Sequence, residues 1–438
     1  MNLNMSQSLN AKLPVHTGPG TPGGDLLRRY WQPIMLVDDL PAARDPVPLR
    51  ILGEDLVLFR DDRGRLGLLG RQCAHRCADL SYGRVENGGL RCVYHGWLFD
   101  IEGHCLEQPG EPGKGQHRDR VLQKAYPCQE RAGAVWTYMG PGEPPLFPDY
   151  PALTAPDAYR FSARWLSNCN WLQASEGNVD PVHTSFLHAL EVPAADADPL
   201  RKAQAQEVFG SDVAPRLSVQ ETRFGLRVIA ERRQQPEGRR LVRVTNFVMP
   251  NACAIGGAET PFGRGGASMF WHVPIDDTSH WRFEFVFHSK AALPRDRLRE
   301  AYRQEADERG VPWRNASNRF GQRRDMLDRS FVGMGQTFPV HDLFVTESQG
   351  EIHDRDNEHL VTSDVAIARS RRQLMQALQD LAEGREPRGV VREPAVNRFH
   401  DLLVLTETLA HDSNVDEFLA EMESADIYAL RPLAEHPT

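Results

Sequence analysis

Short apolar runs that alternate with polar positions dominate the first third of the chain and predict β-strands joined by tight turns. The runs PLRILGEDLVLFR and LGLLGRQC flank the turn DDRGR, which predicts a β-hairpin over residues 48–72. Residues 73–105 contain several glycines, which suit tight loops and short strands better than helix. The stretch AYPCQERAGAVWTYMG, residues 125–140, predicts a second strand pair.

A proline-rich stretch separates this region from a longer one with a different pattern. Residues 141–156 contain six prolines in sixteen positions and predict a linker. Beyond it, apolar and β-branched runs predict strands at 215–233, 239–250, 267–275 and 280–290. Helical periodicity predicts helices at 168–190 with an interruption at Pro181, at 293–309, at 363–383 and at 397–422. Strands and helices that come in runs predict an α+β fold with an antiparallel sheet.

The length of 438 residues exceeds that of a single core, so we expect two domains, residues 1–150 and 151–438. A net charge of −9 argues against nucleic-acid binding. We find no secretory signal and no apolar run of about 18 residues, so we expect a cytoplasmic protein without a transmembrane helix. The seven scattered cysteines form a poor disulfide framework and fit a reducing compartment.

Two short clusters in the first region each combine a thiol with an imidazole: Cys73-x-His75 and Cys92-x-x-His95. Three interpretations compete, namely a zinc site, a [2Fe–2S] centre of Rieske type, and small buried residues without a metal. Structural zinc sites usually pair like with like, whereas a Rieske centre needs two thiolates on one iron and two imidazoles on the other. Two mixed clusters therefore favour the Rieske centre.

A second constellation lies beyond the linker, where Asp180 precedes His183 and His188. Two imidazoles and one distant carboxylate can form the 2-His-1-carboxylate face of a non-haem iron(II) site, which leaves positions open for dioxygen. In an ideal helix, residues five positions apart point about 140° away from each other. The backbone must therefore bend, and Pro181 supplies the reason. Composition alone cannot choose the carboxylate.

Both constellations resemble the aromatic-ring-hydroxylating oxygenases that combine a Rieske domain with a non-haem iron domain. The resemblance covers CAHR, CVYHGWLFD and NWLQASEGNVDPVHTSFLH, the last matching at Asn170, Trp171, Gln173, Glu176, Gly177, Asp180, His183 and His188. It implies an N-terminal all-β Rieske domain followed by a helix-grip catalytic domain, an antiparallel sheet with long helices. The first loop departs from the usual C-P-H-R-G at Ala74 and Cys77. We expect Cys77 to be a packed free thiol.

The stretch HDLFVTESQGEIHDRDNEHLVTSD resembles the phthalate-dioxygenase-like branch of this family. On that match Asp342 is the carboxylate ligand of the iron, and Glu347 is the second candidate. We expect the remaining acids to form charge pairs: Asp354, Asp356 and Glu358. The chain departs from the pattern at His341, Gln349 and Glu351.

The resemblance also gives Asp180 a role between two metal centres. In the family, the equivalent aspartate bridges an iron-ligating histidine and a Rieske histidine of the neighbouring subunit. Carried over, Asp180 would join His183 to His95 across the interface of a homo-trimer or of stacked trimers. A simpler interpretation is that Asp180 only caps the turn that begins at Pro181. Both interpretations are compatible.

The resemblance implies the terminal oxygenase of a multicomponent system, in which a separate flavin and iron–sulfur reductase delivers electrons from NAD(P)H. Dioxygen is the co-substrate, and the aromatic substrate is expected to be a phthalate- or benzoate-type carboxylate. Monooxygenation or O-demethylation of methoxylated or ether-linked aromatics is the alternative. An electron carrier without oxygenase activity is a more remote one, because a carrier has no use for the second constellation.

Recognition of a carboxylate requires a local cation, and Arg243 is the first candidate. It alternates with Val242 and Val244 in a predicted strand, so it faces opposite to them. It points either into the cavity or onto a solvated face. Arg216 is the second candidate.

Overall fold

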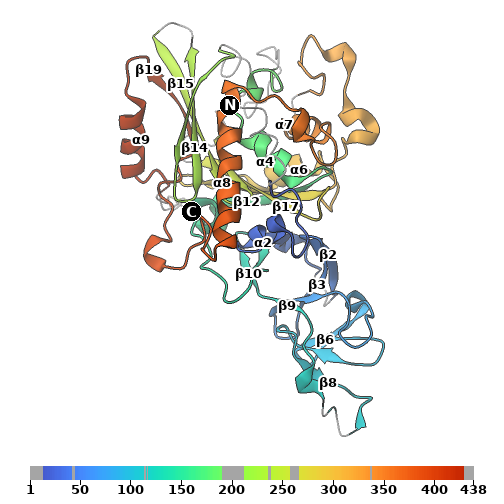
Figure 1. The fold of residues 1–438 in the computed structure, drawn as a ribbon. Coiled ribbons are helices and arrows are strands. Elements are labelled where there is room, and N and C mark those ends of the chain that lie inside the picture. The colour runs from blue at the N-terminus through green and yellow to red at the C-terminus, as the bar shows by residue number, and fades with distance from the viewer. Residues whose placement is uncertain are drawn as a thin grey trace, which may run out of the picture.

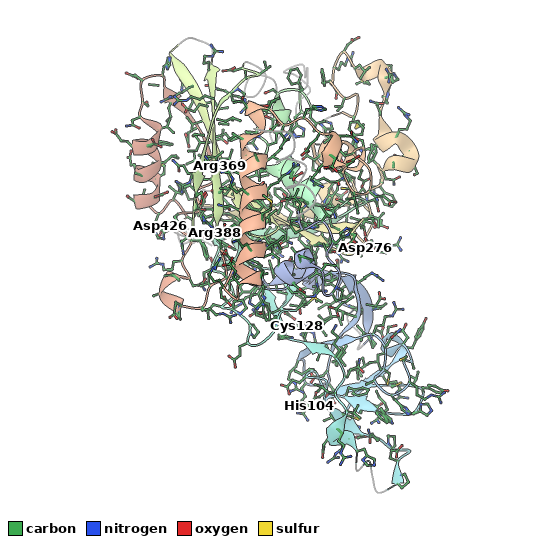
Figure 2. All side chains as sticks on the ribbon, in the orientation of Figure 1. His104, Cys128, Asp276, Arg369, Arg388 and Asp426 are labelled. Atoms are coloured by element: carbon green, nitrogen blue, oxygen red, sulfur yellow. The ribbon has the colours of Figure 1, made fainter. Side chains whose placement is uncertain are left out.

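The computed structural model describes residues 13–41, 45–112, 115, 117–189, 212–234, 238–256, 266–335 and 338–428. An N-terminal β lobe projects from a larger lobe of sheet and helices (Figure 1). Figure 2 marks His104 in the projecting lobe and Cys128 where the two lobes meet. The predicted α+β class is confirmed. No helix in the described part of the chain is both long and apolar enough to cross a membrane.

Two four-stranded antiparallel sheets form the N-terminal lobe. The first contains β2 (Val47–Ile51), β3 (Glu54–Arg60), β4 (Leu66–Gly70) and β9 (Ala125–Tyr126). The second contains β5 (Arg84–Glu86), β6 (Gly89–Arg91), β7 (Leu98–Phe99) and β8 (Cys105–Glu107). The hairpin predicted over 48–72 is confirmed for β3 and β4, and Asp61 closes its turn by accepting the Arg65 N–H at 2.7 Å. The run 48–60, predicted as one strand, is itself a hairpin of β2 and β3 with a turn at Leu52 and Gly53. Cys73 and Cys92 belong to the apolar core of this lobe.

A three-stranded sheet joins this lobe to the rest of the molecule. It contains β1 (Gln32–Leu36), β10 (Cys128–Arg131) and β11 (Ala134–Thr137), so the second predicted strand pair is confirmed. Trp136 of β11 lies 5.2 Å from Trp271 and 5.3 Å from Phe285 of the large sheet, between ring centroids. Because this core is shared, the division at residue 150 stays a prediction.

The large lobe is built on an eight-stranded antiparallel sheet in the order β12-β18-β17-β16-β15-β14-β13, with β19 also paired to β15. The strands are β12 (Arg160–Ser167), β13 (Arg216–Glu221), β14 (Gly225–Gln234), β15 (Arg239–Val248), β16 (Ala252–Ile255), β17 (Gly266–Pro274), β18 (His280–His288) and β19 (Leu405–Ala410). The single strand predicted at 215–233 is wrong, because a turn before Gly225 makes it a hairpin. Gly225 has φ +153°, and a Cβ there would lie 2.1 Å from the carbonyl oxygen of Phe247.

Helices cover the sheet and connect its strands (Figure 1). They are α2 (Pro22–Leu27), α3 (Pro151–Thr154), α4 (Trp171–Val179), α6 (Arg295–Arg303), α7 (Phe338–Glu347), α8 (Val365–Ala382) and α9 (Val415–Ser424). The helix predicted at 363–383 is confirmed as α8, and α6 is shorter than predicted. The helix predicted at 397–422 is wrong. Residues 405–410 pair with β15 instead, and α9 begins only after Asn414, whose Oδ1 accepts the Asp416 N–H at 3.1 Å.

Candidate metal centres

Two loops of the N-terminal lobe fold alike and present the first donor set. In each loop, the cysteine N–H donates to the carbonyl five residues later, and the cysteine carbonyl accepts from the N–H four residues later. These bonds are Cys73 N–Ala78 O (2.8 Å), Cys77 N–Cys73 O (2.8 Å), Cys92 N–Trp97 O (2.8 Å) and Gly96 N–Cys92 O (3.0 Å). The two loops are therefore matching turns that each position one cysteine and one histidine.

The four predicted ligands come together at the tips of these loops. The rings of His75 and His95 lie 4.5 Å apart between centroids, and Nδ1 of His75 is buried without a hydrogen-bond partner. Burial and the adjacent Cys92 together raise the pKa of the Cys73 thiol to about 11. Such thiols become thiolates when a bound cation compensates their charge. Two thiols and two imidazoles in one place fit a Rieske cluster.

Cys77 occupies a backbone position that suits glycine. Its φ is +57°, and Gly96 has φ +74° at the equivalent position of the second loop. The side chain is exposed, so the expectation of a packed thiol is wrong. The matching turn geometry directs this side chain away from the lobe core, which Cys73 and Cys92 enter.

We expect Cys77→Gly to leave the cluster intact and to raise the free energy of unfolding by up to about 1 kcal/mol, because glycine removes the cost of the left-handed backbone. Urea unfolding followed by the visible absorption of the cluster measures this change. Gly96→Ala is the matched control and should destabilise, because its Cβ would lie 2.8 Å from Cγ of Pro109. Loss of the cluster in Cys77→Gly would contradict this account and make Cys77 a ligand.

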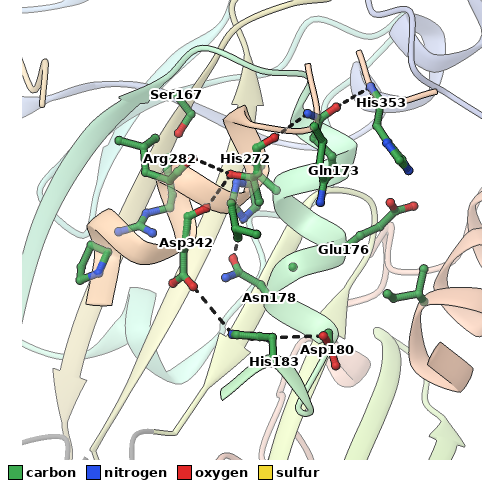
Figure 3. A pocket seen from close by; sticks show the side chains of 18 of the residues that line it. Ser167, Gln173, Glu176, Asn178, Asp180, His183, His272, Arg282, Asp342 and His353 are labelled. Carbon is green, nitrogen blue, oxygen red and sulfur yellow. Dashed lines mark hydrogen bonds and ion pairs between the residues drawn. The ribbon is translucent and has the colours of Figure 1, made fainter. Parts of the chain in front are cut away.

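The second donor set lies between α4, α7 and the large sheet (Figure 3). One ligand atom from each of His183, His188 and Asp342 lies within 4.8 Å of the others. Nε2 of His183 is 3.7 Å and Nε2 of His188 is 3.1 Å from Oδ1 of Asp342. Two imidazoles and one carboxylate that converge in this way fit a mononuclear non-haem iron.

The local backbone explains how residues five positions apart share one site. Helix α4 ends at Val179, and Asp180 is extended with ψ 115°, as expected for a residue before proline. His183 then begins a single 3-10 turn. Oδ1 of Asp180 accepts the Val182 N–H at 2.7 Å, so Asp180 does cap the turn. The bend predicted at Pro181 is confirmed.

Both histidines direct Nε2 at the carboxylate, and each has another polar group beside its Nδ1; for His183 that group lies at ion-pair distance and makes no hydrogen bond to Nδ1. Nδ1 of His183 lies 3.5 Å from Oδ2 of Asp180. Nδ1 of His188 lies 3.3 Å from Nδ1 of His341, whose Nε2 is 3.1 Å from the Gly335 carbonyl. A carbonyl only accepts, so His341 carries its proton on Nε2 and accepts the Nδ1–H of His188. This leaves Nε2 of His188 with a free electron pair for a metal.

His341 is thus a functional residue that the sequence marked only as a departure from the family pattern. We expect His341→Leu to weaken retention of the mononuclear iron by about tenfold, since an orienting partner of a metal-bound histidine is lost. His341→Gln should retain the iron, because the glutamine oxygen can accept the same N–H. The release of iron to a ferrous chelator, followed with the cluster as internal standard, measures this. Equal release from both variants would rule the role out.

Electrostatics favours the ligand-ready forms of Asp342 and His188, whereas His183 must lose a proton to bind a metal. Burial lowers the pKa of His183, but Asp180 and Asp342 outweigh burial and raise it. Burial raises the pKa of Asp342, but its electrostatic interactions with His188, His183 and Arg282 outweigh burial and lower that pKa below its usual range. Burial lowers the pKa of His188. An ionised carboxylate beside a neutral imidazole is the combination that a ferrous ion binds.

Gln173 fixes the distance between the two helices that carry the ligands. Its Nε2 donates to the carbonyls of Thr346 (2.9 Å) and Gly350 (2.8 Å), and its Oε1 accepts the His353 N–H at 2.9 Å. A single buried side chain therefore links α4 to α7 and to the loop after it. Glu176 adds a buried ion pair with Arg371 at 2.6 Å, which links α4 to α8.

The other acidic candidates lie outside the donor set. Glu347 accepts the Asn168 N–H at 2.8 Å, and Glu358 pairs with Arg371 and His353. Asp354 accepts the N–H of Asp356 at 3.1 Å, so these two residues form a turn rather than the expected charge pair.

The two candidate arginines lie on opposite faces of the large sheet. Arg243 of β15 is paired with Ala230, so it shares a face with Arg232, whose Nη2 donates to the Pro181 carbonyl at 2.5 Å beneath the iron-ligand segment. Arg243 is buried on this face. Arg216 is exposed on the edge strand β13, on the face away from the donor set.

Comparison with known proteins matches both regions of the chain that carry the donor sets. Residues 30–127 match the family model of the Rieske [2Fe-2S] domain, and residues 137–418 match the model described as LigXa C-terminal domain like. A 5,5'-dehydrodivanillate O-demethylase oxygenase subunit of Sphingobium sp. is 33% identical over 90% of this chain and 85% of its own length. The phthalate 4,5-dioxygenase oxygenase subunit of Pseudomonas putida is 36% identical over 83% and 84%.

Solved structures share the fold at lower identity. The oxygenase of carbazole 1,9a-dioxygenase, in complex with its ferredoxin, has a TM-score of 0.55 at 19% identity and covers 88% of this chain and 94% of its own. Dicamba monooxygenase has a TM-score of 0.56 at 18% identity, over 82% and 100%. Because the family model of the C-terminal domain matches residues 137–418, the chain contains more than a Rieske domain, and the electron-carrier alternative is set aside. The chain belongs to the Rieske aromatic-ring-hydroxylating oxygenases, in the phthalate-dioxygenase-like branch, as a terminal oxygenase subunit that takes a [2Fe–2S] cluster and a mononuclear iron.

Proposed function

We propose that this terminal oxygenase hydroxylates an aromatic carboxylate of the phthalate or benzoate type. The supporting observation is a pair of buried arginines on the sheet face beneath the donor set. Burial and the charge of Arg232 lower the pKa of Arg243 to about 10, and burial lowers that of Arg232 to about 10. The planar guanidinium of Arg243 matches the two oxygens of a substrate carboxylate. Relatives named for phthalate and 3-chlorobenzoate agree with this class.

The chain's own residues perform three tasks in the proposed reaction. Cys73, His75, Cys92 and His95 would hold the cluster, and His183, His188 and Asp342 would hold the iron. The cluster supplies single electrons, and the mononuclear iron activates dioxygen. Asp180 and His341 keep the Nδ1 protons of the two histidines in place, so that both Nε2 atoms stay available. Arg243 would orient the acidic group of the substrate, and the sheet and α4 would exclude water.

We further propose that electrons pass between subunits of a homo-trimer or of stacked trimers. Within one chain, the loops beside β6 lie far from α4 and α7 (Figure 1). Oδ2 of Asp180 lies 3.5 Å from Nδ1 of His183. The Asp180 side chain is only half-buried, so a second copy of the chain could also reach it. His95 is also half-buried, beside the exposed Tyr94. A carboxylate between two imidazoles would orient both and couple the two centres.

O-demethylation or another monooxygenation is the second candidate, since one relative is named as an O-demethylase. Oxygen uptake with a matched reductase, measured over benzoates, phthalates and methoxybenzoates with product identification, distinguishes the outcomes. A cis-diol indicates dihydroxylation, whereas release of formaldehyde indicates demethylation. No uptake with any aromatic compound would reject the proposal.

We expect Arg243→Gln to lower kcat/KM for aromatic acids by about 10- to 100-fold, the loss expected for a hydrogen bond to a charged group. The value for a neutral aromatic substrate should change little. Arg216→Gln is the matched control, because it removes an exposed arginine from the opposite face. Equal losses for acids and neutral compounds would show that Arg243 supports the fold and does not recognise an acid.

A further inference from the structure

The cavity that His183 and Asp342 line contains a buried cation that makes no hydrogen bond or ion pair with any residue in the described ranges. Arg282 of β18 is 8% exposed, and its Nε is buried with no acceptor. Among the described residues, its guanidinium contacts only two aromatic rings, with Cζ 5.5 Å from the centroid of Trp165 and 5.2 Å from that of Phe270. A buried guanidinium normally binds a carboxylate or carbonyls, so this one indicates a missing acceptor.

Two further donors lie beside Arg282 on the same face of the sheet. Trp165 is directly paired with Arg282 in the register of β12 and β18, and Ser167 follows two residues later. Nε1 of Trp165 is buried without an acceptor. Ser167 also lines the cavity, and within the described residues its hydroxyl makes no hydrogen bond. Figure 3 shows Ser167 and Arg282 among the side chains that line the cavity.

The acids that line the same cavity are all engaged elsewhere. Glu176 and Glu358 pair with Arg371. Asp180 faces His183, and Asp342 faces His188. None of these described carboxylates lies within ion-pair distance of Arg282, so this corner of the cavity offers donors and a positive charge but no carboxylate in contact with them.

We propose that Arg282 and Ser167, with Trp165 as the wall, form a carboxylate-binding subsite beside Asp342. A planar guanidinium matches the two oxygens of a carboxylate. The cavity has a volume of about 190 Å³, whereas a water molecule occupies about 30 Å³. The carboxylate comes either from an acidic group of the substrate, in which case the subsite rests on the proposed function, or from a small acid in solution.

This subsite is distinct from the one proposed at Arg243. Strands β16 and β17 separate β15 from β18, which places the two strands about 14 Å apart at the usual spacing. Arg282 also lies several residues further along the sheet than Arg243. One carboxyl group cannot contact both, so a substrate that uses both subsites carries two acidic groups.

Isothermal titration of the holoprotein in chloride-free buffer tests the subsite. The probes are sodium formate, sodium benzoate and the neutral analogue acetophenone. The variants are Arg282→Gln, Arg282→Lys and Lys290→Gln, the last removing an exposed cation just beyond the end of the same strand. We expect Arg282→Gln to weaken benzoate binding by about 10- to 100-fold, as for loss of a hydrogen bond to a charged group. Arg282→Lys should retain only part of it, because lysine keeps the charge but not the planar fork. Acetophenone binding and the affinities of Lys290→Gln should show no change.

The outcomes separate the two sources of the carboxylate. Dependence on Arg282 for benzoate alone assigns the subsite to the substrate, and dependence for formate as well shows that a free carboxylate suffices. Unchanged affinity in Arg282→Gln, with the cluster spectrum intact, overturns the subsite. Oxygen uptake by Arg282→Gln is measured in parallel. If this variant consumes oxygen and binds benzoate as tightly as the wild type, the subsite is rejected but the proposed oxygenase function stands. If Arg282→Gln does not fold, Ser167→Ala replaces it as the test variant. We expect Ser167→Ala to weaken benzoate binding, both alone and combined with Arg282→Lys. Unchanged benzoate affinity in these variants also overturns the subsite.

Discussion

Replacing Asp342 with asparagine is expected to remove the mononuclear iron and leave the [2Fe–2S] cluster in place. The iron content should fall from about three to about two atoms per chain, because the cluster holds two irons and the third loses its only carboxylate. Loss of a direct ligand should cost more than the 10- to 100-fold typical of an outer partner, so we expect turnover to fall by at least about 1,000-fold. Metal analysis and oxygen uptake measure the two effects.

Glu347→Gln is the matched control for this experiment. It removes the other acidic candidate on the same helix, whose carboxylate accepts the Asn168 N–H. This variant should keep all three irons. Loss of the third iron in Glu347→Gln with its retention in Asp342→Asn would mean that the ligand lies one turn further along α7.

Replacing Asp180 with asparagine is expected to separate electron transfer from metal binding. Both centres should stay occupied, while turnover falls by at least about 100-fold, the upper range for an outer partner of a metal-bound histidine. Asparagine can still accept the Val182 N–H, so this variant retains the cap and removes only the charge. Stopped-flow reoxidation of the reduced cluster by dioxygen measures the transfer.

The control for Asp180→Asn is Asp354→Asn, which alters another aspartate that accepts a backbone N–H two residues later. Its reoxidation rate should equal that of the wild type. If Asp180→Asn also reoxidised at the wild-type rate, Asp180 would act only as a cap, and the electrons would reach the iron by another route.

The donor sets could be predicted from the sequence because their spacing is local. Each Rieske loop is a turn of a few residues, and His183 and His188 lie on one bent segment, so short motifs are informative. Asp342 lies more than 150 residues further along the chain. Only the resemblance to a family selected it from the many acids, and the structure now brings it to the two histidines.

Long-range pairing explains most of what the sequence did not predict. Residues 405–410 form a strand because β15 offers them a partner, which no local pattern shows. Arg282 and Ser167 meet through the register between β12 and β18, and His341 meets His188 through the packing of α7. Strand β12 is different, because RFSARWLS alternates between half-buried and buried positions along its whole length. This alternation is a local signal, so the strand can be predicted from the sequence alone.

One chain carries residues for both a Rieske cluster and a mononuclear iron. Electron paramagnetic resonance of the reduced holoprotein, recorded before and after addition of nitric oxide, detects both centres in one experiment. We expect a Rieske signal in both samples and a new high-spin iron signal with nitric oxide, which disappears in Asp342→Asn. A Rieske signal with no nitric-oxide-dependent iron signal in the iron-replete wild type would mean that the chain holds no mononuclear iron open to a ligand.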